Sequence, residues 1–143
     1  MHLFNVATLF VVLTLVGVEF SVSAFTNPAA SQLEPESQLK LLSRSALVLG
    51  KVMPVWYMAS TVLLGIETWL YWHTPGRAIL LAADTIWILT SVASIVFLVP
   101  LARRVAEGDA DWQRLNRVWD GRHRVRIAAV AAAAVLLAYV VVR

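Results

Sequence analysis

The chain of 143 residues contains no cysteine, and only 15% of its residues are charged. Without cysteine there are no disulfides, no thiolate catalysis, no iron–sulfur ligation and no cysteine-based zinc site. A soluble domain carries about 25% charged residues. This chain is instead 59% hydrophobic, with a mean hydropathy of +0.72. The composition predicts an integral membrane protein whose main partner is the lipid bilayer, and it indicates no nucleic-acid partner.

Four apolar runs are each long enough to cross a hydrocarbon core about 30 Å thick, which takes roughly 20 helical residues. We expect the membrane spans at about residues 3–25, 52–72, 78–101 and 124–142. An amphipathic cytoplasmic extension from Pro35 precedes the second run. Gly108 and the acids Asp109 and Asp111 are expected to form the stop and N-cap before a long fourth helix, which begins at Asp111. The sequence thus predicts an all-α fold, a single transmembrane four-helix bundle over residues 1–143.

Proline and glycine predict where these helices end or bend. Asn27-Pro28 is expected to end the first helix, Pro54 to kink the second, and Pro100 to lie at the end of the third. The sequence His-Thr-Pro-Gly-Arg at residues 73–77 predicts a tight turn between the second and third spans.

The twelve basic residues are distributed unevenly over the connections. Ten of them belong to the connection between the first two spans and the connection between the last two. Only Arg77 and Arg143 lie on the other side. Because basic residues concentrate in cytoplasmic loops, we expect both long connections in the cytoplasm and both termini outside. The membrane that we expect is a bacterial inner (plasma) membrane.

Aromatic residues lie at both ends of the second span. Trp56 and Tyr57 are near its cytoplasmic end, and Trp69, Tyr71 and Trp72 are near its outer end. Tryptophan and tyrosine are enriched at membrane interfaces, so an aromatic belt accounts for these positions. Stacking against a bound ligand is the alternative, and it would make Trp56 and Tyr57 substrate-binding residues.

Charged residues inside membrane spans are costly and are therefore candidates for function. One group, near the outer face, consists of Glu67, His73, Arg77 and Asp84. Pairing of the two acids with Arg77 or His73 would staple the hairpin between the second and third spans. An ion or proton path is the alternative use of the same residues.

A second group of charged residues lies near the cytoplasmic face. Trp119, His123 and Arg126 are spaced i, i+4 and i+7, so they share one face of the fourth helix. Glu19 lies at comparable depth on the first helix, and Lys51 enters from the second. We expect these groups to converge at the mouth of a bundle pocket; interfacial anchoring by arginine is the alternative.

The histidines do not suggest a haem or metal site. His73 and His123 belong to opposite faces of the membrane and are separated by most of a core about 30 Å thick. They cannot ligate one iron within a monomer, and we expect neither a metal nor a cofactor.

Three short motifs, together with the four spans, carry a resemblance to a known family. They are GVEFSVSA at residues 17–24 running toward Asn27-Pro28, Pro100-Leu101 after the third span, and the Trp-x3-His-x2-Arg run at residues 119–126. The chain resembles a widespread family of four-span membrane proteins, largely of unknown function, that includes fungal anthrone oxygenases. One position departs from the family pattern, because Ala102 stands where an asparagine is common.

The resemblance implies a cofactor-independent monooxygenase for a lipophilic aromatic or quinone-like substrate. In anthrone oxygenases the substrate anion reduces dioxygen itself, so the protein has to remove a proton and stabilise the anion. On that basis His123 is the expected base, Arg126 the anion stabiliser and Trp119 the pocket wall. Glu19 would orient the histidine. The remaining substrate-site residues would be Lys51, Trp56 and Tyr57.

A non-enzymatic role fits the same residues, as an assembly subunit of a membrane complex or a small-molecule carrier. It predicts that the polar residues on the cytoplasmic side pair only with one another or with lipid headgroups. The alanine-rich face from Ala128 to Ala138 suits a homo-oligomer contact or packing within the monomer. Besides lipid, the expected partners are therefore a lipophilic small molecule and a second copy of the chain.

Overall fold

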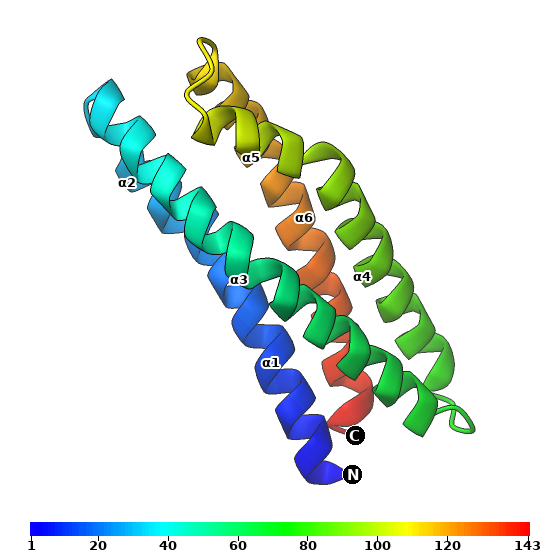
Figure 1. Ribbon diagram of the computed structural model, residues 1–143. Coiled ribbons are helices and arrows are strands. Elements are labelled where there is room, and N and C mark those ends of the chain that lie inside the picture. Colours follow the sequence, from blue (N-terminus) through cyan, green and yellow to red (C-terminus); the bar gives the residue numbers. More distant parts are fainter.

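The computed structural model describes all 143 residues, and it consists of helices joined by short turns, with no strand (Figure 1). The elements are α1 (His2–Ser21), the π-helical turn η1 (Val22–Thr26), α2 (Asn27–Ala30), α3 (Pro35–Leu70), α4 (Arg77–Phe97), α5 (Val99–Ala106) and α6 (Trp112–Val141). Because α1 continues through η1 and α2, and α4 continues into α5, the chain forms four long rods. They cover residues 2–30, 35–70, 77–106 and 112–141. The prediction of an all-α chain with four long helices is confirmed.

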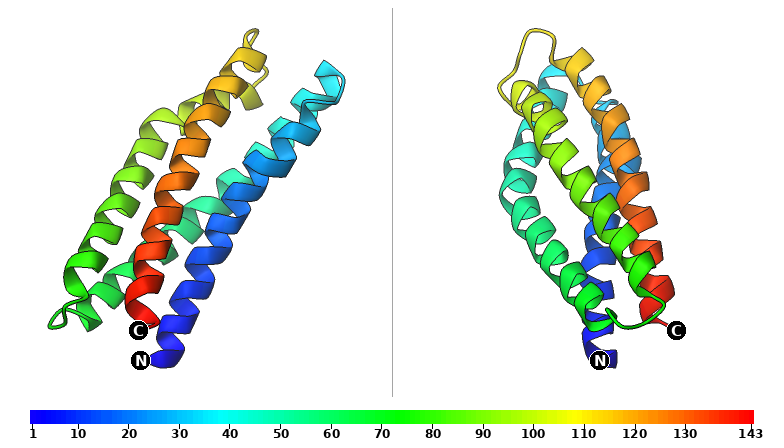
Figure 2. Two further views of the ribbon diagram at one scale, coloured as in Figure 1. Left: turned by 180° about the vertical axis from the view of Figure 1, so that it is seen from behind. Right: turned by 90° about the vertical axis from the view of Figure 1, so that its right-hand side faces the viewer.

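The four rods run up, down, up and down, so each is antiparallel to the next (Figures 1 and 2). α3 and α6 each contact α1, α4 and α5, which closes the bundle into a ring. Both chain termini lie at one end together with the turn between α3 and α4, and we call this the terminal end. The other end, the loop end, holds the connections at residues 31–34 and 107–111. That the loop end faces the cytoplasm stays a prediction.

Apolar side chains fill the centre of the bundle. Leu15, Leu64, Trp87 and Leu137 come from all four rods and are at most 1% exposed. Part of the alanine-rich face of α6 packs here as well, since Ala133 is buried inside the monomer. Small side chains at such positions allow helices to approach closely.

Large apolar side chains also cover the outside of the rods. Phe10 on α1, Met58 on α3, Leu89 on α4 and Val135 on α6 are each between 65% and 69% exposed. Soluble monomers rarely expose large contiguous apolar patches. All four rods are long and apolar enough to cross a membrane, and their outer surface fits the hydrocarbon of a lipid bilayer.

The rods are longer than a bilayer is thick. A hydrocarbon core of about 30 Å takes roughly 20 residues at a rise of about 1.5 Å per residue. Counted inward from the terminal end, its far boundary falls close to Val22 on the first rod, Lys51 on α3 and Arg122 on α6. The polar loop end therefore projects beyond the apolar part of the bundle.

The Asn27-Pro28 pair does not end the first helix, contrary to the prediction. The chain stays helical to Ala30 by way of the π turn, in which the Asn27 N–H donates to the Val22 carbonyl. In a regular helix a proline ring clashes with the carbonyl four residues earlier and leaves it without a donor. The wider turn directly before Pro28 relieves this clash, so the helix continues.

Pro100 does not end the third rod either. α4 ends at Phe97, but α5 begins at Val99 with Pro100 in its first turn, where a missing N–H costs little. The rod therefore runs on to Ala106, beyond its expected end. α3 is continuous through Pro54 and is visibly bowed (Figure 2).

Of the two acids expected to cap α6, Asp109 fixes the connection before this helix and Asp111 does not. Gly108 has a φ of 73°, a conformation that glycine adopts without strain. Asp109 Oδ1 accepts the Asp111 N–H at 3.0 Å, and Oδ2 lies 2.7 Å from the Arg104 guanidinium. The Asp111 N–H, followed by Arg104, lowers the pKa of Asp109. Asp111 occupies the N-cap position of α6 but makes no side-chain capping bond.

Candidate functional site

Residues of the first rod face α6 in steps of four, at Leu15, Glu19, Ser23 and Asn27. In a regular α-helix each step of four turns about 40° past a full circle, so such a series drifts off one face. The hydrogen bonds of the π turn span five residues, which widens the helix locally. The wider π turn compensates for this rotation, so Ser23 and Asn27 stay on the same face of the first rod as Glu19.

An ion pair between the first and last rods forms the centre of the site. Arg126 Nη2 donates to Glu19 Oε2 and lies 2.9 Å from His123 Nδ1. His123 Nε2 is 3.0 Å from the backbone carbonyl of Glu19. Glu19 is 3% exposed and His123 is 1% exposed. Three of the polar groups that were expected to converge therefore meet inside the bundle.

The hydrogen bonds of His123 fix its tautomer. A guanidinium has only donors, so Nδ1 accepts from Arg126. Nε2 must then carry the hydrogen that it donates to the Glu19 carbonyl. Both ring nitrogens are used within the protein, and in this arrangement His123 has no free lone pair for a ligand proton. The expected role of His123 as base therefore has no support from the geometry.

Aromatic rings border the ion pair. The Trp119 ring stacks on His123, with centroids 4.5 Å apart and 17° between the ring planes. The guanidinium carbon of Arg126 is 5.8 Å from the ring centroid of Tyr57. Three buried polar atoms here have no hydrogen-bond partner: Glu19 Oε1, Arg126 Nε and the Tyr57 hydroxyl. The Tyr57 hydroxyl also faces the Glu19 carboxylate. Because buried polar atoms are nearly always paired, a ligand or water can complete the hydrogen bonds of this set.

Two other expected site residues lie apart from the cluster. Lys51 does not join Glu19, since its side chain is exposed and forms no ion pair. A lysine at the boundary of an apolar helix extends its charge toward the membrane interface. Trp56 faces the bundle, and its Nε1 donates to the Val11 carbonyl of α1 at 3.1 Å. Trp56 therefore braces α3 against α1.

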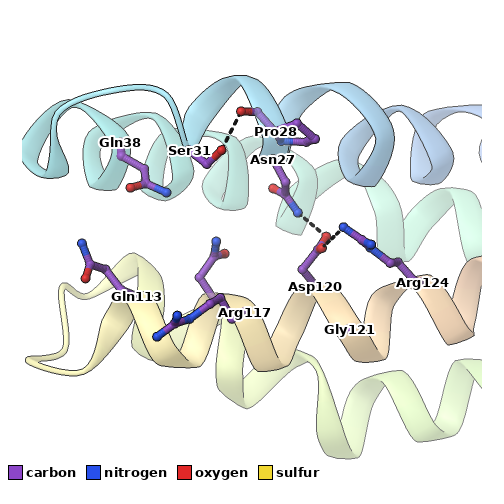
Figure 3. A pocket seen from close by; sticks show the side chains of 10 residues that line it. Asn27, Pro28, Ser31, Gln38, Gln113, Arg117, Asp120, Gly121 and Arg124 are labelled. Carbon is purple, nitrogen blue, oxygen red and sulfur yellow. Dashed lines mark hydrogen bonds and ion pairs between the residues drawn. The ribbon is translucent and has the colours of Figure 1, made fainter.

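Asp120, which the sequence analysis passed over, ties the loop end together. Its Oδ1 accepts from Asn27 at 2.6 Å, and its Oδ2 pairs with Arg124 at 2.8 Å (Figure 3). Oδ1 also accepts from Ser23 at 3.2 Å. A signal was present in the sequence, since Asp120 and Arg124 are spaced i, i+4. The other partners are contributed by the first rod, and a single helix does not reveal them.

A cavity of about 660 Å³ adjoins Asp120 between the first rod, the start of α3 and α6. Figure 3 shows its polar side chains pointing from α2 and α6 toward one another. It is lined by Asn27, Pro28, Ser31, Gln38, Gln113, Asn116, Arg117, Asp120, Gly121 and Arg124. Neither Glu19 nor Arg126 lines this cavity.

The expected staple at the terminal end does not form. The predicted turn is present at residues 71–76, but no ion pair involves Glu67, His73, Arg77 or Asp84. Asp84 Oδ2 accepts from the Thr68 hydroxyl at 2.7 Å. The Arg77 guanidinium instead lies over the Trp72 ring, 4.9 Å from its centroid. The staple fails because Arg77 is exposed whereas Glu67 is buried in the bundle.

No group of three or more His, Asp or Glu side chains is placed to hold a metal ion together. A comparison of the chain with protein-family models, curated proteins and solved structures finds no match. No family is therefore shown for the chain.

Proposed function

We propose that this chain holds a lipophilic, weakly acidic molecule against the Glu19–Arg126 pair and removes a proton from it. The molecule would be aromatic or quinone-like, and the reaction would be the cofactor-independent oxygenation that the family resemblance implies. The observation that supports this most is the set of three buried atoms without partners around one ion pair: Glu19 Oε1, Arg126 Nε and the Tyr57 hydroxyl.

Glu19 is the base in this proposal, in place of His123. Arg126 holds Glu19 Oε2, while Oε1 has no partner and can accept a proton. The guanidinium is a permanent cation that can stabilise the anion formed. His123 is a positioning residue, because it accepts from Arg126 and donates to the Glu19 backbone. Trp119 holds the imidazole ring in place by stacking.

The oxygenation needs no external reductant. After proton loss the substrate anion transfers electrons to dioxygen, and an activated CH2 group is oxidised to a carbonyl. One oxygen atom of dioxygen enters the product, and the other leaves as water with the two hydrogens of the CH2 group. The chain then has to supply only a base, a fixed cation and surroundings with little water.

A non-enzymatic role is the second candidate, and one observation favours it. Glu19, His123 and Arg126 bond to one another, as that role predicts. Neither the cavity of about 660 Å³ nor one of about 480 Å³ at the terminal end is lined by these residues. In an assembly subunit or a carrier the cluster would join α1 to α6 without contacting a substrate.

Oxygen uptake by the purified protein tests the first candidate. The assay uses a panel of anthrones, which carry the activated CH2 group, with isotopically labelled dioxygen to follow one oxygen atom into the product. We expect Glu19→Gln to lower turnover by about 100-fold or more, the size typical of a lost general base. His123→Gln should lower it less, because glutamine can still donate to the Glu19 carbonyl.

Glu36→Gln is the matched control, since Glu36 is an exposed acid at the start of α3. It should turn over substrate at the unmodified rate. A folded protein that consumes no dioxygen with any member of the panel, or equal rates in Glu19→Gln and Glu36→Gln, would contradict the oxygenase proposal.

A further inference from the structure

A second buried acid lies far from the Glu19 site, near the terminal end of the bundle. Glu67 is one turn from the end of α3 and is 0% exposed. Neither of its carboxyl oxygens has a hydrogen-bond partner. The proposed oxygenation makes no use of it, and no apolar packing requirement explains an acid at this position.

The polar group across from Glu67 belongs to α1. Asn5 Nδ2 donates to the Tyr71 hydroxyl at 2.8 Å, which fixes the register of α1 against α3. Thr8 lies one turn inward from Asn5, and Glu67 lies one turn inward from Tyr71, so the two face each other. Thr8 is also 0% exposed, and its hydroxyl has no partner other than the Glu67 carboxyl that it faces.

No cation of the chain forms an ion pair with Glu67. On α4, one carboxyl oxygen of Asp84 accepts from the Thr68 hydroxyl. Asp84 is an acid and therefore supplies no positive charge. From α6, the buried residues at this end are apolar: Leu137, Val140 and Val141. Arg77 lies on Trp72, and the N-terminal amine, at the end of α1 beyond Asn5, acts on Glu67 through its charge without forming an ion pair.

An isolated ionised carboxylate in such surroundings is very costly, and buried charges persist only when they are paired or bind a cation. A hard metal cation takes six or more oxygen ligands. Glu67 and Thr8 offer three side-chain oxygens, and no third acid or histidine joins Glu67 and Asp84. The cation with the smallest ligand requirement is the proton.

We propose that Glu67, facing Thr8, is a proton-binding site that exchanges protons with the terminal end of the bundle. The neutral carboxylic acid needs no counter-ion, and the Thr8 hydroxyl can accept its hydrogen. The Tyr71 hydroxyl, which Asn5 holds in place, lies between this site and the terminal end and can accept a proton and pass it onward. The site is separate from the Glu19–Arg126 pair and does not depend on the function proposed there.

Dicyclohexylcarbodiimide tests this assignment, because it is lipophilic and modifies carboxyl groups that carry a proton inside apolar surroundings. The full chain in lipid nanodiscs is treated at several values between about pH 5 and about pH 9, a range over which ordinary exposed acids are already ionised. Modified residues are identified by intact mass and peptide mapping. We expect one main adduct on Glu67, with a yield that falls several-fold at the alkaline end.

Glu67→Gln should abolish this adduct, while Glu36→Gln, which changes an exposed acid on the same helix, should leave it intact. Thr8→Val should shift the pH at which the yield falls while keeping the adduct on Glu67. An infrared difference spectrum between the two ends of the range should show loss of a protonated carboxyl band that Glu67→Gln lacks. If both the Glu67 adduct and this band are missing, the assignment is overturned. Suppression of the adduct by sodium ions at constant pH would also overturn it, in favour of a metal cation.

Discussion

Arg126 on α6 donates to the Glu19 carboxylate on α1, although 107 residues separate the two in the sequence. The same nitrogen contacts His123 Nδ1, and His123 reaches back to the Glu19 backbone. Two hydrogen bonds thereby join the first and last rods near the far boundary of the apolar core. Because Glu19 is almost fully buried, removing its partner has a larger effect than removing a partner at the surface.

Arg126→Ala should destabilise the bundle strongly. It leaves the Glu19 carboxylate buried without its cation, a loss that costs about 3–5 kcal/mol in proteins. The measurement is the thermal unfolding midpoint in a mild detergent. Adding Glu19→Gln to Arg126→Ala should recover part of the loss, because the uncompensated charge is then gone.

Arg124→Ala is the matched control for Arg126→Ala. Arg124 pairs with Asp120 on the same helix, and its side chain is 65% exposed. An exposed pair contributes about 0–1 kcal/mol, so the unfolding midpoint should barely move. Equal destabilisation by Arg124→Ala and Arg126→Ala would show that the buried ion pair contributes no more to stability than the exposed one.

Asp109→Asn should weaken the turn before α6 in a pH-dependent manner. The pKa of Asp109 is lowered in the folded chain by the Asp111 N–H and by Arg104. A group with a lowered folded pKa stabilises the protein above its unfolded pKa, about 3.9 for aspartate, and this contribution is lost as pH falls through the folded value. The unfolding midpoint of Asp109→Asn should therefore be lower than that of the unmodified chain at neutral pH and equal to it in strong acid. A difference that stayed constant over this range would contradict the assignment.

Single cysteines can establish the orientation, since the chain has none of its own. Thr74→Cys lies in the turn at the terminal end, and Ala110→Cys lies in a connection at the loop end; both positions are exposed. From the positive-inside rule, a membrane-impermeant thiol reagent should label Thr74→Cys in intact cells. It should label Ala110→Cys only after the cells are permeabilised. The reverse pattern would show that the loop end faces outward.

Helical periodicity and span length were enough to predict part of the site. The i, i+4, i+7 spacing placed Trp119, His123 and Arg126 on one face of α6. Counting residues from the helix ends placed Glu19 at the same depth. Both arguments need only the local geometry of one helix and the thickness of the membrane, which is why they succeed without knowledge of the fold.

The rotation of each rod about its axis was not predictable in the same way. Lys51 points outward and Glu67 inward, although the α3 sequence around both is apolar on most faces. Contacts with the neighbouring rods determine which face of α3 is buried, and the hydrophobic periodicity of α3 alone does not reveal that face. The contact of Asn27 with Asp120 was not predictable either, because the two residues are 93 positions apart in the sequence. Local sequence rules also predicted that the first helix ends at Asn27-Pro28, whereas it continues.

Native mass spectrometry of the gently purified chain tests the central claim, that the Glu19–Arg126 pair holds a small molecule. We predict a retained mass that is not a lipid, present in the unmodified chain and in Glu36→Gln and lost in Glu19→Gln and in Trp119→Ala. Bare protein or lipid adducts alone, with Glu19→Gln indistinguishable from the unmodified chain, would contradict this claim and would favour a structural role for the pair.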